Sequence, residues 1–256
     1  MGHTENQLKY TSFFSIIIVS LNAGDELLKT VQSVLNQSFQ DYEIIVKDAG
    51  SKDGSLEQLP DDRRIRRIIH PDRGLYHAMN QATEQAHGKY LYYLNCGDYL
   101  YDDMVLQKVY TVATSLPCVQ PYVLYGESYY RNLQRMRIPP QTITPYFWSV
   151  SNICHQAVFF SKDSLRQPDA YDLSYRISAD NELMVYQFLK GIPFVSLGFP
   201  VCSYEGGGYS ETEKGMEIGK KEHRQIMKKY FHSWKRIVFL GEHIIRYWGR
   251  RIRRKK

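Results

Sequence analysis

The sequence lacks the cysteine spacing of a zinc-binding or disulfide-rich protein. Its four cysteines, Cys96, Cys118, Cys154 and Cys202, lie far apart and form no C-x-x-C pair. Structural zinc sites and disulfide frameworks both require patterned cysteines. We therefore expect neither in this chain, and a reducing cytoplasm fits this cysteine usage best.

Long apolar segments are also missing. The longest apolar runs, such as FFSIIIV at 13–19, are too short to cross a bilayer, and residues 1–12 are polar with no signal-peptide core. We expect a protein that is neither secreted nor membrane-spanning. With 256 residues, 43% of them hydrophobic, the chain can bury one large core.

An excess of positive charge is missing outside one segment. The net charge is +6, but residues 235–256 hold nine Lys or Arg against one Glu, or +8, which leaves −2 for the rest. Nucleic-acid-binding proteins usually present a broad basic surface. The nearly neutral body argues against such a module, which stays an alternative only through the basic tail.

Apolar strands alternate with helical patterns along the first hundred residues. Strands are predicted at 15–19, 43–47, 65–69 and 90–94, with helices over 27–35 and 75–87. This alternation predicts an α/β fold with a doubly wound, mostly parallel sheet and helices on both faces. Ligands bind such sheets beyond the carboxyl ends of the strands.

Polar residues follow each of the four predicted strands. They are Asn22, Asp48 with Asp53, Asp72 with Arg73, and Asp98. One such residue alone is typical of a turn or a helix cap. Because all four loops lie at the same edge of a parallel sheet, we expect them to share one crevice.

A glycine-rich phosphate loop is absent from this edge. The first loop reads SLNAG and matches neither G-x-G-x-x-G nor G-x-x-x-x-G-K-[ST]. The same absence disfavours a sugar-nucleotide pyrophosphorylase-like enzyme, an alternative that needs a glycine-rich basic loop there. Carboxylates with single basic residues suit a divalent cation that bridges to phosphate oxygens.

An ordered series of motifs resembles the inverting family 2 glycosyltransferases of the GT-A fold, closest to bacterial enzymes that build exopolysaccharide, capsule and O-antigen units. The motifs are SIIIVSLN, IIVKDAGSKDGS, HPDRGLYHAMNQATEQAHGKYLYYLNCGD, ICHQAVFF, YDLSYRISADNEL and YEGGGYS, and they span about residues 13–210. The resemblance implies transfer of a sugar from a nucleotide diphosphate sugar to a lipid-linked saccharide in surface polysaccharide biosynthesis.

The resemblance also assigns donor-binding residues. Ser20 and Asn22 would form part of the nucleotide pocket wall. Asp48 would accept hydrogen bonds from uracil or ribose, and Asp53 would support that loop. Arg73 would lie near the diphosphate, where a fixed cation offsets leaving-group charge.

NCGD at 95–98 stands where the family has its metal-binding D-x-D element. Asn95 and Gly97 replace carboxylates there, which leaves Asp98 as the only charged ligand for Mn²⁺ or Mg²⁺. The alternative interpretation is that Asp98 merely caps the following turn.

Asp180 matches the position of the family's catalytic base. It falls in the first turn of a helix predicted from Ser178 to Gly191, with Glu182 close by as the next candidate. Ala179 replaces the usual preceding glutamate. Acidic residues at a helix start are otherwise commonly a complement to the helix dipole.

Two further segments are weaker candidates. His155 and Gln156 could bind donor or acceptor, although an isolated histidine in an aromatic setting is often a satisfied core residue. The loop at 205–210, which contains Gly207, could close over the diphosphate or serve as a linker.

The expected organisation is an N-terminal extension at 1–12, a catalytic domain at 13–212 and a helical basic tail at 213–256. The catalytic domain divides into a nucleotide-binding half at 13–100 and an acceptor half at 101–212. Within the tail, residues 235–256 predict an amphipathic helix that lies on an anionic membrane. We expect a peripheral protein on the inner face of the plasma membrane that binds no nucleic acid.

Overall fold

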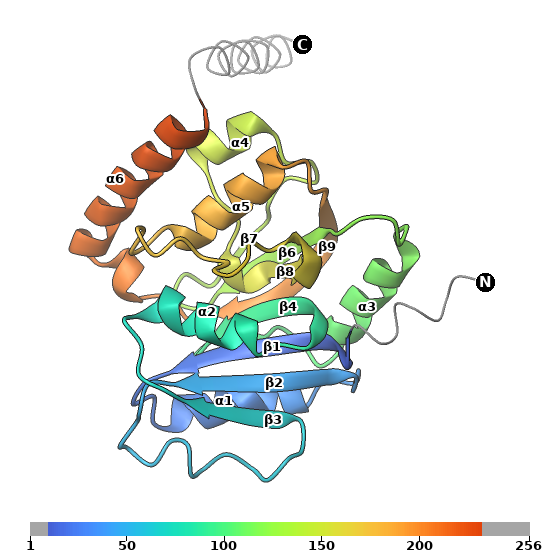
Figure 1. The fold of residues 1–256 in the computed structure, drawn as a ribbon, viewed down its shortest axis with the longest axis vertical. Coiled ribbons are helices and arrows are strands. Elements are labelled where there is room, and N and C mark those ends of the chain that lie inside the picture. Colours follow the sequence, from blue (N-terminus) through green and yellow to red (C-terminus); the bar gives the residue numbers. More distant parts are fainter. Residues whose placement is uncertain (1–9, 232–256) are drawn as a thin grey trace.

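The computed structural model describes residues 10–231, which form a nine-stranded sheet with helices on both faces (Figure 1). The strands are β1 (Ser12–Ser20), β2 (Tyr42–Asp48), β3 (Ile65–Ile69), β4 (Gly88–Asn95), β5 (Tyr99–Leu100), β6 (Val123–Tyr130), β7 (Arg135–Arg137), β8 (Val158–Ser161) and β9 (Phe194–Tyr204). The helices are α1 (Asp25–Leu35), α2 (Leu75–Glu84), α3 (Val105–Ser115), α4 (Pro145–Val150), α5 (Ala179–Leu189) and α6 (Glu213–Tyr230).

The sheet has a parallel part and a mixed part. Its order is β3-β2-β1-β4-β8-β6-β9-β5, with β7 paired to β6. β3, β2, β1 and β4 run parallel, whereas β8 is antiparallel to both β4 and β6. The predicted α/β sheet with helices on both faces is therefore confirmed.

Alternation along β1 explains why both faces are covered. Ile16 and Ile18 belong to a core cluster with residues of α1 and α3, whereas Ile17 and Val19 belong to a second cluster with residues of α2 and α5. Successive strand side chains point to opposite faces. A strand that is apolar at every position is thereby buried on both sides, with α2 in front of the sheet and α1 behind it in Figure 1.

Strand register brings the predicted polar loops together. Ser20 at the end of β1 lies opposite Asp48 at the end of β2, and Val19 lies opposite Asn95 at the end of β4. The carboxyl ends of three neighbouring strands therefore meet at one edge of the sheet, as expected for a doubly wound sheet.

Helix α2 ends earlier than the sequence pattern predicts, at Glu84 rather than residue 87. The backbone N–H groups of Gln85 and Ala86 bond to carbonyls three residues back, and the N–H of His87 donates to Glu43 Oε1. These bonds turn the chain out of the helix and into β4.

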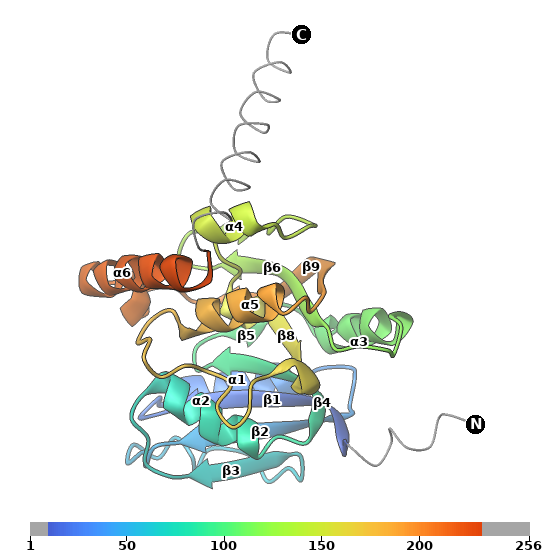
Figure 2. The same cartoon turned by 45° about the horizontal axis from the view of Figure 1, so that its top comes forward.

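Helix α6 packs against the body of the protein. Figures 1 and 2 both show it beside α5, and its Ile226 belongs to the same core cluster as Leu183 of α5. The start of the predicted tail, 213–230, is thus part of the packed structure. The amphipathic helix predicted for 235–256 and most of the N-terminal extension lie outside the described residues. Across residues 10–231, no helix is both long and apolar enough to span a membrane.

Candidate active site

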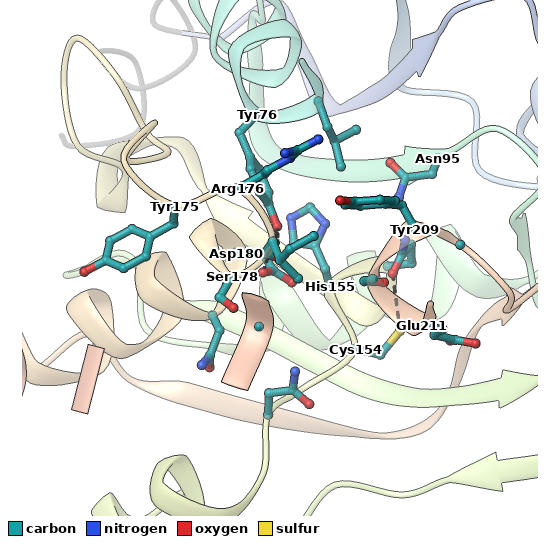
Figure 3. Close-up of a pocket in the computed structure, with 18 of the residues that line it drawn as sticks. Tyr76, Asn95, Cys154, His155, Tyr175, Arg176, Ser178, Asp180, Tyr209 and Glu211 are labelled. Carbon is teal, nitrogen blue, oxygen red and sulfur yellow. Dashed lines mark hydrogen bonds between the residues drawn. The ribbon is translucent and has the colours of Figure 1, made fainter. Parts of the chain in front are cut away.

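A cavity of about 1560 Å³ opens where the ends of β4 and β9 meet α2, α5 and α6 (Figure 3). Six of the sequence-predicted site residues line it: Arg73, Asn95, Asp98, His155, Gln156 and Asp180. The other seven do not: Ser20, Asn22, Asp48, Asp53, Gly97, Glu182 and Gly207. The cavity thus gathers residues from both halves of the chain.

Asp98 is a buried carboxylate beside this cavity, with 4% of its surface exposed. Its Oδ1 accepts a hydrogen bond of 2.8 Å from the backbone N–H of Glu205. Burial raises the pKa of Asp98 to about 7, against smaller lowering effects from that N–H and from Arg131. A buried acid with so high a pKa is suited to exchange its proton for a cation.

Asn95 and Glu205 contribute further oxygen atoms beside Asp98, and we call these three residues the Asp98 corner. The Oδ1 atom of Asn95 is buried and has no hydrogen-bond partner among residues 10–231, and Asn95 and Glu205 both line the cavity. Hard divalent cations prefer carboxylate and amide oxygens and take their remaining ligands from phosphate and water. These three residues therefore fit Mg²⁺ or Mn²⁺, although residues 10–231 contain no group of three His, Cys, Asp or Glu able to hold a metal alone.

Gly97 shapes this corner through its backbone. Its φ is +92°, and a Cβ atom there would lie 2.3 Å from Glu205 Oε2. Its N–H donates to Thr30 Oγ1 at 3.0 Å, which ties the turn to α1. Glycine is required because an L side chain would be strained and would push the Glu205 carboxylate away.

Asp180 stands in the first turn of α5 and faces the same cavity (Figure 3). The hydroxyl of Tyr76, from the first turn of α2, lies 3.0 Å from Asp180 Oδ1 and 2.6 Å from the carbonyl of Ile177. Burial, followed by the charge of Asp180, raises the pKa of Tyr76, which keeps this hydroxyl protonated. Tyr76 thereby holds one carboxylate oxygen of Asp180 in place.

Glu222 of α6 fixes the segment that leads into Asp180. This carboxylate is 6% exposed and accepts hydrogen bonds from three consecutive backbone N–H groups, those of residues 176–178, at 2.7, 2.9 and 2.9 Å. Bonds from several N–H groups to one carboxylate are strong. The start of α5, and with it Asp180, is consequently positioned by α6.

Arg73 reaches the cavity from a loop that is held by a buried lysine. Lys47 is fully buried, and its Nζ pairs with Asp72 Oδ2 at 2.9 Å and donates to the carbonyl of His70 at 2.6 Å. Asp72 Oδ1 in turn accepts from the N–H of Gly74, the N-cap of α2, whose φ is +119°. Arg73 is thereby presented beside the amino end of a helix, a favourable place for an anion.

The loops after β1 and β2 hold each other rather than line the cavity. Asp48 accepts from Gly50 N–H and from both the N–H and hydroxyl of Ser51, and Asn22 bonds to the same loop through Ser51 and Lys52. Asp53 likewise accepts from the N–H of Gly24 at 2.8 Å and from Ser55. Their carboxylates shape this edge of the sheet.

Ser20 stands at the end of β1 beside this network. Its side chain is 8% exposed, and its Oγ atom forms no hydrogen bond within residues 10–231. An unpaired buried hydroxyl is costly unless a ligand or water satisfies it.

His155 is a neutral wall residue. It is 6% exposed, its Nε2 lies 2.8 Å from the hydroxyl of Tyr171, and its ring stacks on Tyr93 at 5.3 Å. Burial lowers the pKa of His155, with a partial offset from the charge of Asp180. Its neighbour Gln156 is also buried, and the Sγ of Cys154 donates to its Oε1.

Glu182 is directed into the protein rather than into the cavity. It is fully buried and forms ion pairs with Arg166 at 2.6 Å and with Lys229 at 3.0 Å, and it also accepts from the hydroxyl of Tyr230. These contacts join α5 to the end of α6. With its charge fully used, Glu182 is a structural residue in this geometry.

The 205–208 loop borders the cavity through Gly206 and Gly208, while Gly207 donates its N–H to Glu211 Oε2 at 2.8 Å. Sequence reasoning named the 205–210 loop but assigned no role to the Glu205 carboxylate beside Asp98, and it missed Tyr76, which contacts Asp180, and Glu222, which binds the approach to α5. Glu205 could have been found because it precedes three glycines at a strand end. The partners of Tyr76 and Glu222 are 45 or more residues away in most of these bonds, and the sequence carries no local signal for them.

Comparison with known proteins agrees with this geometry. Residues 15–167 match the family model described as Glycosyl transferase family 2. The chain is 30% identical over 226 residues to a PGL/p-HBAD biosynthesis glycosyltransferase of Mycobacterium bovis, covering 81% of this chain and 83% of the relative.

Two solved structures share the fold. S. aureus TarS 1-349 in complex with UDP has a TM-score of 0.62 at 14% identity, covering 85% of this chain and 70% of that one. A mannosyltransferase from Pyrobaculum calidifontis, in complex with GDP-Man and Mn²⁺, has a TM-score of 0.63 at 12% identity, covering 86% and 64%. This chain spans only 42% of a longer TarS chain. From its sequence match and its fold, the chain belongs to glycosyltransferase family 2, and it is a glycosyltransferase.

Proposed function

We propose that this enzyme transfers a sugar from a nucleotide diphosphate sugar to a saccharide acceptor with inversion at the sugar C1. Support for the donor comes from fold neighbours solved with UDP, with UDP-GlcNAc and with GDP-Man. The observation that carries the proposal is that one cavity contains both Asp180 and Asp98. The carboxylate of Asp180 is held there by the hydroxyl of Tyr76.

The donor occupies the sheet edge. Its nucleoside lies against Ser20, Asn22 and the Asp48 loop, where the unpaired Ser20 hydroxyl offers a hydrogen bond. Its diphosphate lies between Arg73 and the Asp98 corner. Asp98, Asn95 and Glu205 would hold Mg²⁺ or Mn²⁺, which when bound would offset negative charge on the leaving diphosphate.

The acceptor reacts at Asp180. This carboxylate takes the proton of an acceptor hydroxyl as the oxygen bonds to C1, and the bond from C1 to the diphosphate oxygen breaks on the opposite face. Arg73 stabilises the charge that develops on the leaving diphosphate. One displacement of this kind inverts the configuration at C1.

The acceptor is a lipid-linked saccharide in bacterial surface polysaccharide biosynthesis, and the enzyme is peripheral on the inner face of the plasma membrane. The basis is the tail, which carries +8 over residues 235–256. Each basic residue near an anionic surface contributes about 1 kcal/mol of attraction. Replacing Arg250, Arg251, Arg253 and Arg254 with Gln should strongly reduce sedimentation with anionic vesicles, and unchanged sedimentation would contradict the membrane role.

The stereochemistry of the product tests the reaction, once the donor has been identified. The donor is identified by a thermal-shift screen of UDP, GDP, CMP and dTDP sugars with Mn²⁺, because a ligand that binds the folded state stabilises it. Proton NMR of the product formed from an α-linked donor then gives the configuration of the new bond. We expect a β-linkage, and an α-linkage would contradict a single displacement with Asp180 as base.

A further inference from the structure

Five cations line the cavity and form no ion pair within residues 10–231. Arg73 belongs to the donor side and Arg137 donates to Asn152 Oδ1, which leaves Arg176, Lys220 and Arg224 beside α5 and on α6. All three residues are exposed, so their charges are open to a ligand that enters the cavity. The Arg176 guanidinium lies over the ring of Tyr209, 5.2 Å from the ring centroid. Unpaired cations that converge on a cavity mark a place for an anionic ligand.

Two of these cations belong to a single face of α6. Gly219, Lys220, His223 and Arg224 are spaced so that they lie on adjacent turns, and all four line the cavity. Gly219 approaches the start of α5, since a Cβ atom there would lie 3.9 Å from Ser178 Oγ. The cationic face of α6 is therefore next to the turn that carries Asp180.

Asn181 adds an unsatisfied group at this junction. It is 4% exposed and lines the cavity, and its buried Oδ1 has no hydrogen-bond partner in the described part of the chain, 10–231. Its Nδ2 lies 3.4 Å from His223 Nδ1 of α6. A buried carbonyl oxygen beside Asp180 is suited to accept a hydrogen bond from a hydroxyl of a bound sugar.

Exposed apolar side chains continue the same wall outward. Val150, at the end of α4, is 63% exposed, and Leu173 is 41% exposed, and both line the cavity. His223 Nε2 lies 3.2 Å from the carbonyl of Ser149, which places the end of α4 next to the cationic face of α6. Cations bordered by exposed aliphatic groups match an anion that carries an apolar chain.

We propose that Arg176, Lys220 and Arg224 form a phosphate subsite for the acceptor, which is a saccharide joined through phosphate to an apolar chain. This inference rests on the proposed function and assigns its acceptor side. The sugar hydroxyls meet Asp180 and Asn181, the phosphate meets the cations of α6, and the chain extends over Val150 and Leu173. The donor diphosphate has its own cation, Arg73, in the loop that precedes α2.

The test uses farnesyl diphosphate as the probe, titrated calorimetrically into the full chain that is already saturated with Mn²⁺ and the nucleoside diphosphate found by thermal shift. We compare the wild type with the double variant Lys220→Gln/Arg224→Gln. The matched control is Lys214→Gln/Lys221→Gln, which removes the same charge from exposed positions of α6 outside the cavity. Inorganic pyrophosphate and farnesol separate the phosphate from the chain.

We expect the cavity variant to bind farnesyl diphosphate at least about tenfold more weakly, with unchanged nucleotide affinity, and the control variant to match the wild type. Farnesol and pyrophosphate should each bind more weakly than farnesyl diphosphate. Equal losses in the two variants, or a loss of nucleotide affinity in the cavity variant, would overturn the subsite. Pyrophosphate binding as tight as farnesyl diphosphate would overturn the lipid-linked assignment. Absence of nucleotide binding by the wild type would instead count against the proposed function.

Discussion

The loops after β1 and β2 and the acceptor side of the cavity use their polar groups differently. In those loops, Asp48, Asp53 and Asn22 are occupied by N–H and hydroxyl groups of the two loops themselves. On the acceptor side, Asn181 Oδ1 has no hydrogen-bond partner, and Lys220 and Arg224 form no ion pair, within residues 10–231. Satisfied groups hold a surface in shape, whereas unsatisfied ones in a cavity are available to a ligand.

This difference separates the roles of acidic residues that look alike in the sequence. Glu182 and Asp180 are two residues apart, yet Glu182 is fully buried in ion pairs with Arg166 and Lys229, and Asp180 faces the cavity. Position along α5 decides the outcome, because the two side chains project about 200° apart around a helix. This difference in pairing favours Asp180 over Glu182 as the proposed base.

The largest effect is expected for Asp180→Asn. The change is nearly isosteric and keeps the contact with Tyr76, but it removes the proton acceptor, so kcat should fall by about 1,000-fold. Nucleotide affinity, measured by calorimetry, should stay the same. The exposed Asp169→Asn serves as the control. A fall of only a few-fold would move the base elsewhere.

Asp98→Asn should come next. We expect metal-dependent nucleotide affinity to fall on the order of 100-fold, since loss of even outer partners of a metal ligand costs roughly 10–100-fold. Thermal stability without metal at pH 8 should not decrease, because the variant removes a buried charge and can still accept from Glu205 N–H. Asp103→Asn is the matched control. Unchanged metal-dependent binding would make Asp98 a turn cap.

The pH dependence of metal binding follows from the same residue. Burial raises the pKa of Asp98 to about 7, from an ordinary value near 3.8. The folded state then holds a proton that the unfolded chain releases, so this group makes the free energy of unfolding fall as pH rises from about 4 to about 7. Metal must displace that proton. Affinity for Mg²⁺ should therefore drop about fivefold between pH 7 and pH 6 and level off above pH 8; a flat profile would contradict this.

Glu222→Gln should give the smallest change. One of its oxygens becomes an NH₂ group that cannot accept from the backbone of residues 176–178, which should lower the free energy of unfolding by about 1–3 kcal/mol. Because Asp180 follows that segment, kcat should fall by several-fold while nucleotide affinity is kept. Glu217→Gln, exposed on the same helix, is the control. A loss of stability with unaltered kcat would make Glu222 purely structural.

Local patterns predicted much of the fold and part of the site. The apolar run at 65–69 matches β3, and the acidic start of α5 was located because helix starts have a recognisable composition. The packing of α6 against the cavity was not predicted, because its amphipathic pattern is equally typical of a helix in a basic tail. The contact that fixes α6 joins Glu222 to residues 44–46 positions away, which no local pattern indicates. Whether a carboxylate is free or satisfied depends on such long-range contacts.

A crystal structure with the selected nucleoside diphosphate and Mn²⁺ tests the division of the cavity most directly. We predict that the anomalous scattering of Mn²⁺ places the ion in direct contact with Asp98, with the diphosphate beside Arg73, and that Asp180, Asn181 and Lys220 do not touch the nucleotide. A diphosphate bound to Lys220 and Arg224 instead, with no metal at Asp98, would contradict the account.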